Sequence, residues 1–277
     1  MIKGKPFVKW AGGKRQIIDK LKFYAPNEFN TYYEPFVGGG ALLYELSPRS
    51  AVINDCNKEL MNVYECLKDA KKFDAMCREL NHHEANHSEE YYYQIRNLDR
   101  DKAKFNRLPD YKRAARTIYL NKACFNGLYR VNSKGLFNVP YNNKVNGVSI
   151  DECNLRNISN YLNLNKVDIR EGDFEAACSD VKKGDLVYFD SPYVPVSKTA
   201  NFTNYTKDGF SLNDHKRLAK LFCTLDSLGA YIMLSNNDVP LVHELYSQFN
   251  VTSVDARRAV NRDATKRKGK EVIVTNF

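Results

Sequence analysis

Three short segments of this sequence could bring polar groups or bare backbone to a ligand, and each directly follows an apolar run. The segment 35–40 (PFVGGG) contains three glycines, which let the backbone approach a ligand closely before a helix begins. Asp55 ends the run 51–55 and is placed to accept hydrogen bonds from ribose hydroxyls. The segment 190–193 (DSPY) places a carboxylate, a proline and a tyrosine after the run 187–189. This last segment raises the question of why a buried strand should end in an acid beside an aromatic ring.

Each segment also has a purely structural explanation. A glycine-rich turn between a strand and a helix is a weak signal, because nucleotide-binding folds of every kind contain one. Asp55 could be the N-cap of a helix that begins near residue 57. Asp190 and Ser191 belong to residue types that punctuate strand ends, and Pro192 would stop a strand outright. The residues alone leave both interpretations open at all three places.

The apolar runs alternate along the chain with helical patterns. Strands are expected at the start of 31–46 and near 51–55, 166–174, 185–190, 230–237 and 271–277, and helices over 12–25, at the end of 31–46, and over 211–229 and 239–249. Ser211 is expected to cap the third of these helices. This alternation predicts a doubly wound, mostly parallel α/β sheet. Ligands of such sheets bind outside the carboxyl ends of the strands, where all three segments would lie.

The region 57–165 has a different character. It is rich in Tyr, Asn, Lys and Arg, and it contains helical stretches such as 110–124 and an aperiodic loop, 125–147. We therefore expect one α/β domain, 1–56 and 166–277, interrupted by an inserted helical domain, 57–165.

The composition is that of an ordinary globular protein with a basic excess. The chain has 277 residues, 43% of them hydrophobic, and a net charge of +9. A basic excess makes a polyanion a plausible partner without establishing one. No apolar run approaches membrane-spanning length, and the N-terminus lacks the apolar core of a secretory signal, so we expect no membrane association and a cytoplasmic location.

Neither the cysteines nor the histidines predict a metal site. The seven cysteines are odd in number and form no CxxC pair, which indicates reduced thiols. His82, His83 and His87 lack an acidic or cysteine partner at ligand spacing, so a surface helix is the expected setting.

Taken together, these segments resemble the Dam-type DNA adenine-N6 methyltransferases of the D12 class, alpha group. The similarity implies a Rossmann-like methyltransferase sheet with an inserted target-recognition domain, acting on double-stranded DNA as a monomer. The matching stretches follow the family's order over nearly the whole chain: VKWAGGK (8–14), EPFVGGGAL (34–42), INDCN (53–57), FNGLYRVNSKGLFNVP (125–140), VYFDSPYVPVSKTANFTNY (187–205) and LSNND (234–238).

The resemblance assigns catalysis to Asp190, Pro192 and Tyr193, which occupy places of the family's Asp-Pro-Pro-Tyr motif. It implies that the Asp190 carboxylate and a main-chain carbonyl accept the two N6–H bonds of an adenine. Tyr193 would stack on that base once it is turned out of the duplex. Ser191 departs from the family's first proline, which puts the stiffness of the loop in doubt.

The resemblance also implies S-adenosylmethionine as the methyl donor and no metal. The matching cofactor positions are Trp10, Lys14, Phe36, Gly38, Gly40, Asp55 and Asp190.

The inserted region resembles the loop with which Dam-type enzymes recognise GATC. Arg130 would read a guanine and Leu128 would contact the thymine methyl, while Phe125 would wedge into the duplex. Lys9 would read the guanine preceding the target adenine. Plain phosphate contacts are the alternative for Arg130 and Lys9. The full set of implied DNA-binding residues is Lys9, Phe125, Asn126, Leu128, Arg130 and Pro140.

Three other functions compete with this interpretation. N4-cytosine methyltransferases share the chemistry of an exocyclic amine, but the loop beginning at Phe125 resembles the adenine enzymes. A non-enzymatic DNA-binding protein on a decayed fold should have lost Asp190 or Tyr193, and both are present. A protein methyltransferase with an Asn-Pro-Pro-Tyr motif fits less well, because the motif begins with an acid and the insert is basic.

Overall fold

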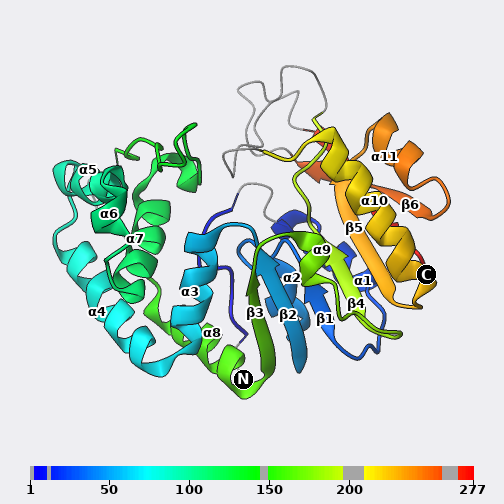
Figure 1. Cartoon of the computed structure of the whole chain (residues 1–277), viewed down its shortest axis with the longest axis horizontal. Coiled ribbons are helices and arrows are strands. Elements are labelled where there is room, and N and C mark those ends of the chain that lie inside the picture. The colour runs from blue at the N-terminus through cyan, green and yellow to red at the C-terminus, as the bar shows by residue number, and fades with distance from the viewer. Residues whose placement is uncertain (1–2, 11–13, 144–148, 196–208, 258–267) are drawn as a thin grey trace.

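The structure is a computed structural model that describes the chain except residues 1–2, 11–13, 144–148, 196–208 and 258–267 (Figure 1). The described part contains a seven-stranded sheet of order β3-β2-β1-β4-β5-β7-β6. β1 to β5 are parallel, and β7 runs antiparallel to both β5 and β6. The strands are β1 (Tyr32–Glu34), β2 (Ser50–Asp55), β3 (Lys166–Glu171), β4 (Leu186–Phe189), β5 (Tyr231–Asn237), β6 (Asn250–Arg257) and β7 (Lys268–Thr275).

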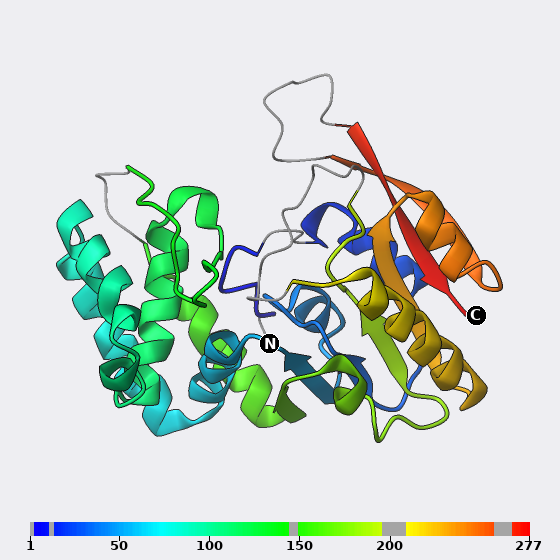
Figure 2. The same cartoon turned by 45° about the horizontal axis from the view of Figure 1, so that its top comes forward.

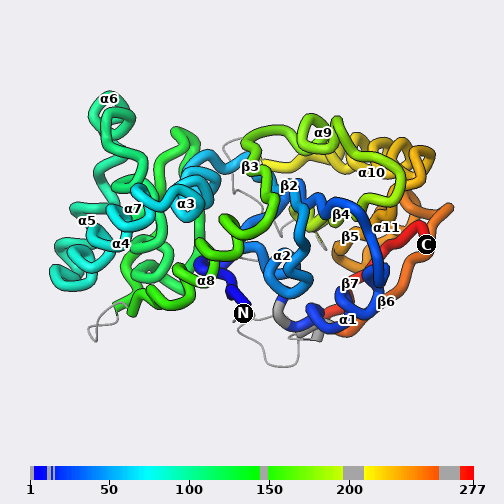
Figure 3. The backbone as a smooth tube through the Cα atoms, turned by 90° about the horizontal axis from the view of Figure 1, so that it is seen from below, coloured from blue at the N-terminus to red at the C-terminus, as the bar shows by residue number. Residues whose placement is uncertain are grey.

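Helices cover both faces of the sheet, which confirms the doubly wound α/β fold (Figure 3). α1 (Ile18–Tyr24) and α2 (Ala41–Leu46) lie on one face, and α9 (Phe174–Ala177), α10 (Leu212–Ser227) and α11 (Pro240–Leu245) lie on the other. Successive strand residues alternate between the two apolar clusters: Tyr32 packs in the first and Tyr33 in the second. Because both faces of the sheet are covered by helices, the central strands have continuous apolar sequences rather than alternating apolar and polar residues.

The strand order reverses between β1 and β4. From β1 the chain moves outward to β2 and β3, then returns to β4 beside β1 before continuing to β5. Tyr32 of β1 is aligned with Ala51 of β2 and with Leu186 of β4, so the carboxyl ends of these strands lie along one edge. Asp55 and the segment after Phe189 therefore meet at the topological switch point.

The helices of the insert lie beyond the β3 edge of the sheet (Figures 1 and 2). They are α3 (Lys58–Lys68), α4 (Ala70–Ala85), α5 (Glu89–Asn97), α6 (Lys102–Phe105), α7 (Asp110–Ala123) and α8 (Glu152–Leu164), with short 3-10 turns η2 (Leu98–Arg100) and η3 (Phe125–Gly127). Leu60 of α3 and Ile158 of α8 belong to the same apolar cluster as the sheet residue Tyr188. A separate cluster, which includes Tyr92, Leu120 and Phe137, supports the far part of the insert.

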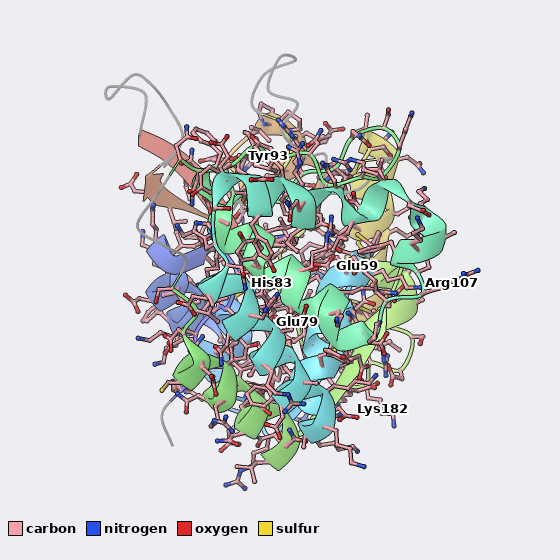
Figure 4. All side chains as sticks on the ribbon, turned by 90° about the vertical axis from the view of Figure 1, so that its left-hand side faces the viewer. Glu59, Glu79, His83, Tyr93, Arg107 and Lys182 are labelled. Atoms are coloured by element: carbon pink, nitrogen blue, oxygen red, sulfur yellow. The ribbon has the colours of Figure 1, made fainter. Side chains whose placement is uncertain are left out.

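The histidine group of α4 is not simply a surface feature. His83 is only 2% exposed, lies among aromatic rings and bonds through Nδ1 to the Tyr91 hydroxyl at 2.7 Å (Figure 4). His87 meets the hydroxyls of Tyr119 and Tyr141 at 2.9 and 3.1 Å. The expected surface helix is therefore wrong for His83, because the insert packs its own core against that side of α4. Within the described residues, no group of three or more potential ligands could hold a metal ion.

Two expectations at the C-terminal end of the sheet need correction. The helix expected over 239–249 ends at Leu245, and a strand that was not predicted, β6, follows from Asn250. β6 pairs with β7 along its whole length and is the last strand at this edge of the sheet. Among the described residues, no helix has the length and apolar character needed to cross a membrane.

Candidate active site

The motif after β4 meets a lysine from the beginning of the chain. Lys14 lies in the 3-10 turn η1 (Lys14–Gln16) and is only 4% exposed. Its Nζ is 2.6 Å from Oδ1 of Asp190 and 4.5 Å from the centre of the Tyr193 ring. The structure thus brings an N–H donor between a carboxylate and an aromatic face.

The loop that carries the motif is held by side chains at the end of β5. The Val194 N–H donates to Oδ1 of Asn236 at 2.9 Å, and Nδ2 of Asn237 donates to the Val194 carbonyl at 2.7 Å. The Tyr193 hydroxyl donates to Oε2 of Glu271 on β7 at 2.9 Å. Ser191, 2% exposed, accepts from Nδ2 of Asn236 at 3.5 Å. These bonds fix the loop although serine replaces the proline expected from the resemblance.

Asp190 is a carboxylate whose charge is compensated locally. Burial raises the pKa of the Asp190 carboxyl, and the Lys14 ammonium opposes that rise. The Ser235 hydroxyl, which also meets the Tyr188 hydroxyl at 2.8 Å, donates to Asp190 at 3.4 Å. Sequence reasoning missed Ser235, Asn236, Asn237 and Glu271 as supports of the motif, although the polar run that ends β5 was a visible signal.

The glycine loop and Asp55 form a second part of the site. Gly38 has φ +48° and its N–H donates to Oδ2 of Asp55 at 3.2 Å. The Asn57 N–H donates to Oδ1 of Asp55 at 2.9 Å. Burial raises the pKa of Asp55 to about 6, while these two backbone donors oppose the rise. The Tyr64 hydroxyl of α3 donates to the Gly38 carbonyl at 3.0 Å and thereby holds the glycine loop in place.

The alternative role of Asp55 as a helix cap does not hold. The N-cap of α3 is Asn57, whose side-chain oxygen accepts from the Leu60 N–H at 3.2 Å. Asp55 lies two residues earlier, and its oxygens are held by backbone donors outside the helix interior.

Two aromatic residues expected near a cofactor lie at opposite sides of the glycine loop. A Cβ added at Gly38 would be 3.0 Å from Cδ1 of Trp10, so the indole lies directly on the loop. Phe36 packs on Phe174 and Phe210, with ring centres 5.3 and 5.8 Å away. Gly40, at φ +71°, is the N-cap of α2 and lies against Tyr64 and Tyr44. The expected cofactor residues Trp10, Phe36, Gly38, Gly40 and Asp55 thus surround the ends of β1 and β2.

The expected DNA-binding residues also come together. We call residues 124–141 the recognition loop; its ends are joined by the Phe125 N–H, which donates to the Pro140 carbonyl at 2.9 Å. The stem of Lys9 lies on this loop, because a Cβ at Gly127 would be 2.5 Å from Cδ of Lys9. Arg130 donates through Nε to Oδ1 of Asn138 at 2.8 Å. Of the six expected residues, Leu128 is half-buried. The other five are exposed: Lys9, Phe125, Asn126, Arg130 and Pro140.

The family model of the D12 class N6 adenine-specific DNA methyltransferases matches residues 10–260, which include the motif, the glycine loop and the recognition loop. The chain belongs to this class of DNA methyltransferases. It is 45% identical over 274 residues to the type II methyltransferase M1.LlaDCHI of Lactococcus lactis subsp. cremoris, covering 99% of this chain and 95% of that protein. It is 41% identical over 290 residues to the type II methyltransferase M.MjaIII of Methanocaldococcus jannaschii, covering 99% of both. The DNA adenine methylase of Salmonella typhi is 32% identical over 270 residues, covering 97% of this chain and 93% of that protein.

This DNA methyltransferase has two groups of residues at the switch point, one around Asp190 and one around Asp55. Lys14, Asp190 and Tyr193 form a compact ion pair and ring contact. The loop around Gly38 and Asp55 offers bare backbone and a carboxylate. The segment 196–205, part of the sequence resemblance, lies outside the described residues.

Proposed function

We propose that this chain transfers a methyl group from S-adenosylmethionine to the N6 amine of an adenine turned out of double-stranded DNA, within the site GATC. The contact that carries the proposal is the position of the Lys14 ammonium, 2.6 Å from Asp190 and 4.5 Å from the centre of the Tyr193 ring. An adenine could make the same two contacts as the Lys14 ammonium, because its amine donates N–H hydrogen bonds to a carboxylate and its ring stacks on an aromatic face. The geometry therefore supports an amine of a planar base as the substrate group.

Asp190 would act on the amine as a hydrogen-bond acceptor. The lone pair of an adenine amine is delocalised into the ring, which makes the nitrogen a poor nucleophile. A carboxylate accepting one N6–H and a main-chain carbonyl of the motif accepting the other would draw the nitrogen toward tetrahedral geometry. The bonds from Asn236 and Asn237 hold the loop before the reaction, so the acceptors need little reorganisation during it. Lys14 contacts Oδ1 of Asp190, and the carboxylate has further lone pairs, including those of Oδ2, that could accept the amine.

The residues around the glycine loop fit the donor. Gly38 and Gly40 have positive φ and lie where a side chain would collide with Trp10 or with Tyr44 and Tyr64. Asp55 receives two backbone donors and retains lone pairs for further hydrogen bonds. We infer that Asp55 accepts hydrogen bonds from the ribose hydroxyls, while Trp10 and Phe36 bound the pocket. When bound, S-adenosylmethionine supplies a methyl group on a positively charged sulfur. No metal enters the proposal.

The recognition loop supports double-stranded DNA as the partner. The chain carries a net charge of +9, and neutralising phosphates releases condensed counterions. Arg130 is exposed and its guanidinium is oriented by Asn138, which suits a two-pronged contact with guanine. We propose that Arg130 and Lys9 read guanines, that Leu128 contacts the thymine methyl, and that Phe125 is the wedge. Asn126 and Pro140 would complete the surface.

We further propose a division of labour between 1–56 with 166–277, which would bind the donor and catalyse, and 57–165, which would bind DNA. The enzyme would act as a monomer, because this one chain carries both the motif and the recognition loop. We infer a cytoplasmic location, which agrees with seven cysteines that are all unpaired.

Asp190→Ala tests the catalytic part of the proposal. We expect methyl transfer to be abolished in single-turnover assays on a GATC duplex, while DNA affinity is largely kept, because phosphate contacts supply most of it. Affinity for S-adenosylmethionine is measured in parallel by calorimetry. Asp19→Ala, which removes an exposed acid of α1, is the matched control. Appreciable transfer by Asp190→Ala would show that Asp190 is not the catalytic acceptor.

The modified base and its sequence context test the rest. Mass spectrometry of nucleosides from DNA treated with the purified protein is expected to show N6-methyladenine, and sequencing of that DNA is expected to place it in GATC. N4-methylcytosine, or methyladenine in another context, would contradict the corresponding part of the proposal.

A further inference from the structure

A direct aromatic contact connects the recognition loop to the glycine loop. The rings of Tyr129 and Trp10 are stacked, with centres 5.1 Å apart and planes at 28°. Trp10 lies in turn on Gly38, whose N–H donates to Asp55. One continuous series of contacts therefore leads from the residue between Leu128 and Arg130 to the carboxylate that ends β2.

A second contact ties the same two segments together. Asn121, near the end of α7, is 1% exposed. Its Oδ1 accepts from the Lys9 N–H at 2.7 Å, and its Nδ2 donates to the carbonyls of Lys9 and Gly127 at 2.8 and 2.9 Å. The amide thus fixes the backbone of Lys9, next to Trp10, relative to the backbone of Gly127, two residues before Tyr129. The N-terminal segment runs between the insert and the sheet, where a displacement on one side would reach the other (Figure 1).

The other side of Tyr129 is anchored in the insert. Its ring meets the edge of Phe137 at 5.6 Å, and Phe137 is 4% exposed. The Phe137 N–H donates to Oδ2 of Asp99 at 2.9 Å, and Asp99 pairs with the buried Arg116. Tyr129 therefore lies between Phe137 of the insert and the indole of Trp10, so that the position of the indole and the position of the loop depend on each other.

We propose that Tyr129 is a positioning residue that couples occupancy of the donor pocket to DNA recognition, an inference that rests on the proposed function. A donor that contacts Gly38 and Asp55 restrains Trp10, and Trp10 restrains Tyr129 and its neighbour Arg130. The coupling is reciprocal, so DNA at the recognition loop strengthens donor binding by the same factor. The energy of an aromatic pair sets this factor at about three- to tenfold.

The test measures the coupling factor itself. Anisotropy of a labelled GATC duplex gives the DNA affinity with and without saturating S-adenosylhomocysteine, which occupies the donor pocket and cannot transfer a methyl group. Calorimetry gives the affinity for S-adenosylhomocysteine with and without the duplex. Three proteins are compared: the natural chain, Tyr129→Leu, which removes the ring, and Tyr129→Phe, which keeps it.

We expect a coupling of about three- to tenfold in the natural chain and in Tyr129→Phe, and a factor near one in Tyr129→Leu. Affinity for S-adenosylhomocysteine alone should change less than about threefold in Tyr129→Leu, because Trp10 and Asn57 lie between Tyr129 and the residues Gly38 and Asp55. Trp10 is the only tryptophan of the chain, so its emission reports the loss of the stacked ring independently. Loss of coupling at unchanged single affinities is not the result of a merely structural defect.

The possible outcomes distinguish failure of the coupling role of Tyr129 from failure of the proposed methyltransferase function. If the natural chain binds S-adenosylhomocysteine and methylates adenine, but Tyr129→Leu keeps its coupling, the coupling role is wrong and the proposed function stands. A natural chain that does not bind S-adenosylhomocysteine overturns both. If Tyr129→Leu does not fold, Trp10→Leu removes the same stack from its other side, with Trp10→Phe as control. Unchanged coupling in Trp10→Leu likewise overturns the proposal.

Discussion

At the scale of single residues, three acids at the strand ends have different partners and therefore different properties. Glu34 ends β1 and receives the Tyr32 hydroxyl at 2.9 Å, Asp55 receives two backbone N–H groups, and Asp190 faces an ammonium. Burial raises the pKa of all three, and the Lys14 ammonium in contact with Asp190 opposes the rise at that carboxyl. Sequence indicated Asp55 and Asp190 because each ends an apolar run. Local patterns did not pair Asp190 with Lys14, which lies far away along the chain; Lys14 was named through the family resemblance, as a cofactor residue.

The raised pKa of Asp55 predicts a pH dependence of donor binding. A carboxyl with a pKa of about 6 is protonated below that pH and then no longer accepts both ribose hydroxyls. Affinity for S-adenosylhomocysteine should be constant above pH 7 and fall by up to about tenfold per pH unit below pH 6. Calorimetry from pH 5 to 8 measures this. Asp55→Asn should bind more weakly at pH 8 and lose most of this pH dependence; equal affinity of the natural chain at pH 5 and pH 8 would contradict the assignment.

At the scale of elements, the alternation of apolar runs and helical patterns was sufficient for most of the fold. The five parallel strands, α10 with its Ser211 cap, and α7 were all predicted near their observed bounds. β6 was not predicted because it is an edge strand, paired on one side, whose sequence is largely polar, whereas the predicted strands are continuous apolar runs. The recognition loop has no periodicity. Its shape depends on the adjacent Asn121 and on Lys9 and Trp10 from the beginning of the chain, and no local pattern reveals the latter two contacts.

The conformation of Gly38 in the glycine loop predicts that adding one methyl group there, by substitution with alanine, weakens donor binding. Gly38→Ala introduces a Cβ at φ +48° that would be 3.0 Å from the Trp10 ring. We expect affinity for S-adenosylhomocysteine to fall at least about tenfold, because the left-handed conformation costs about 1–2 kcal/mol and the indole must also move. Calorimetry measures the affinity. Gly135→Ala is the control, since Gly135 has φ +75° but nothing within 4 Å of the added carbon. It should cost stability without affecting the donor, and equal losses of donor affinity in both variants would contradict the prediction.

At the scale of the whole molecule, two buried histidines in separate regions predict sensitivity to acid. Burial lowers the pKa of His83 in the insert and of His215 in α10 to about 4. The unfolded chain takes up these protons below about pH 6.5, so each histidine removes stability as pH falls from 6.5 toward 4. Between pH 7 and 5 the loss is at most about 2 kcal/mol for each.

Urea unfolding at pH 7 and pH 5 checks this expectation. His83→Leu and His215→Leu should each reduce the difference in unfolding free energy between the two pH values, and their effects should add because the sites are far apart. Lys20→Leu, which changes an exposed residue of α1 and no histidine, is the control and should leave the difference unchanged. A pH difference that is the same in all three variants would show that the buried histidines do not cause the loss.

Binding of DNA also depends on the whole molecule, because the basic chain attracts the phosphates of any DNA sequence. This nonspecific attraction has to be distinguished from a specific contact with a base. Arg130 and Lys134 lie in the recognition loop and are both exposed, and the Arg130 guanidinium is oriented by Asn138. A phosphate contact contributes to all sequences equally, so Lys134→Ala should weaken GATC and scrambled duplexes alike and reduce the salt slope by about one.

Arg130→Ala should behave differently, since a lost guanine contact costs about 1–3 kcal/mol on GATC alone and relaxes discrimination at one base pair. Anisotropy titrations of GATC, single-substituted and scrambled duplexes over a range of salt concentrations measure both effects. Asn138→Ala should reproduce a weaker form of the Arg130 defect, because it removes the acceptor that orients the guanidinium. If Arg130→Ala weakens all duplexes equally, Arg130 is a phosphate contact, and the guanine must be read by another residue even though the chain is an adenine-specific DNA methyltransferase.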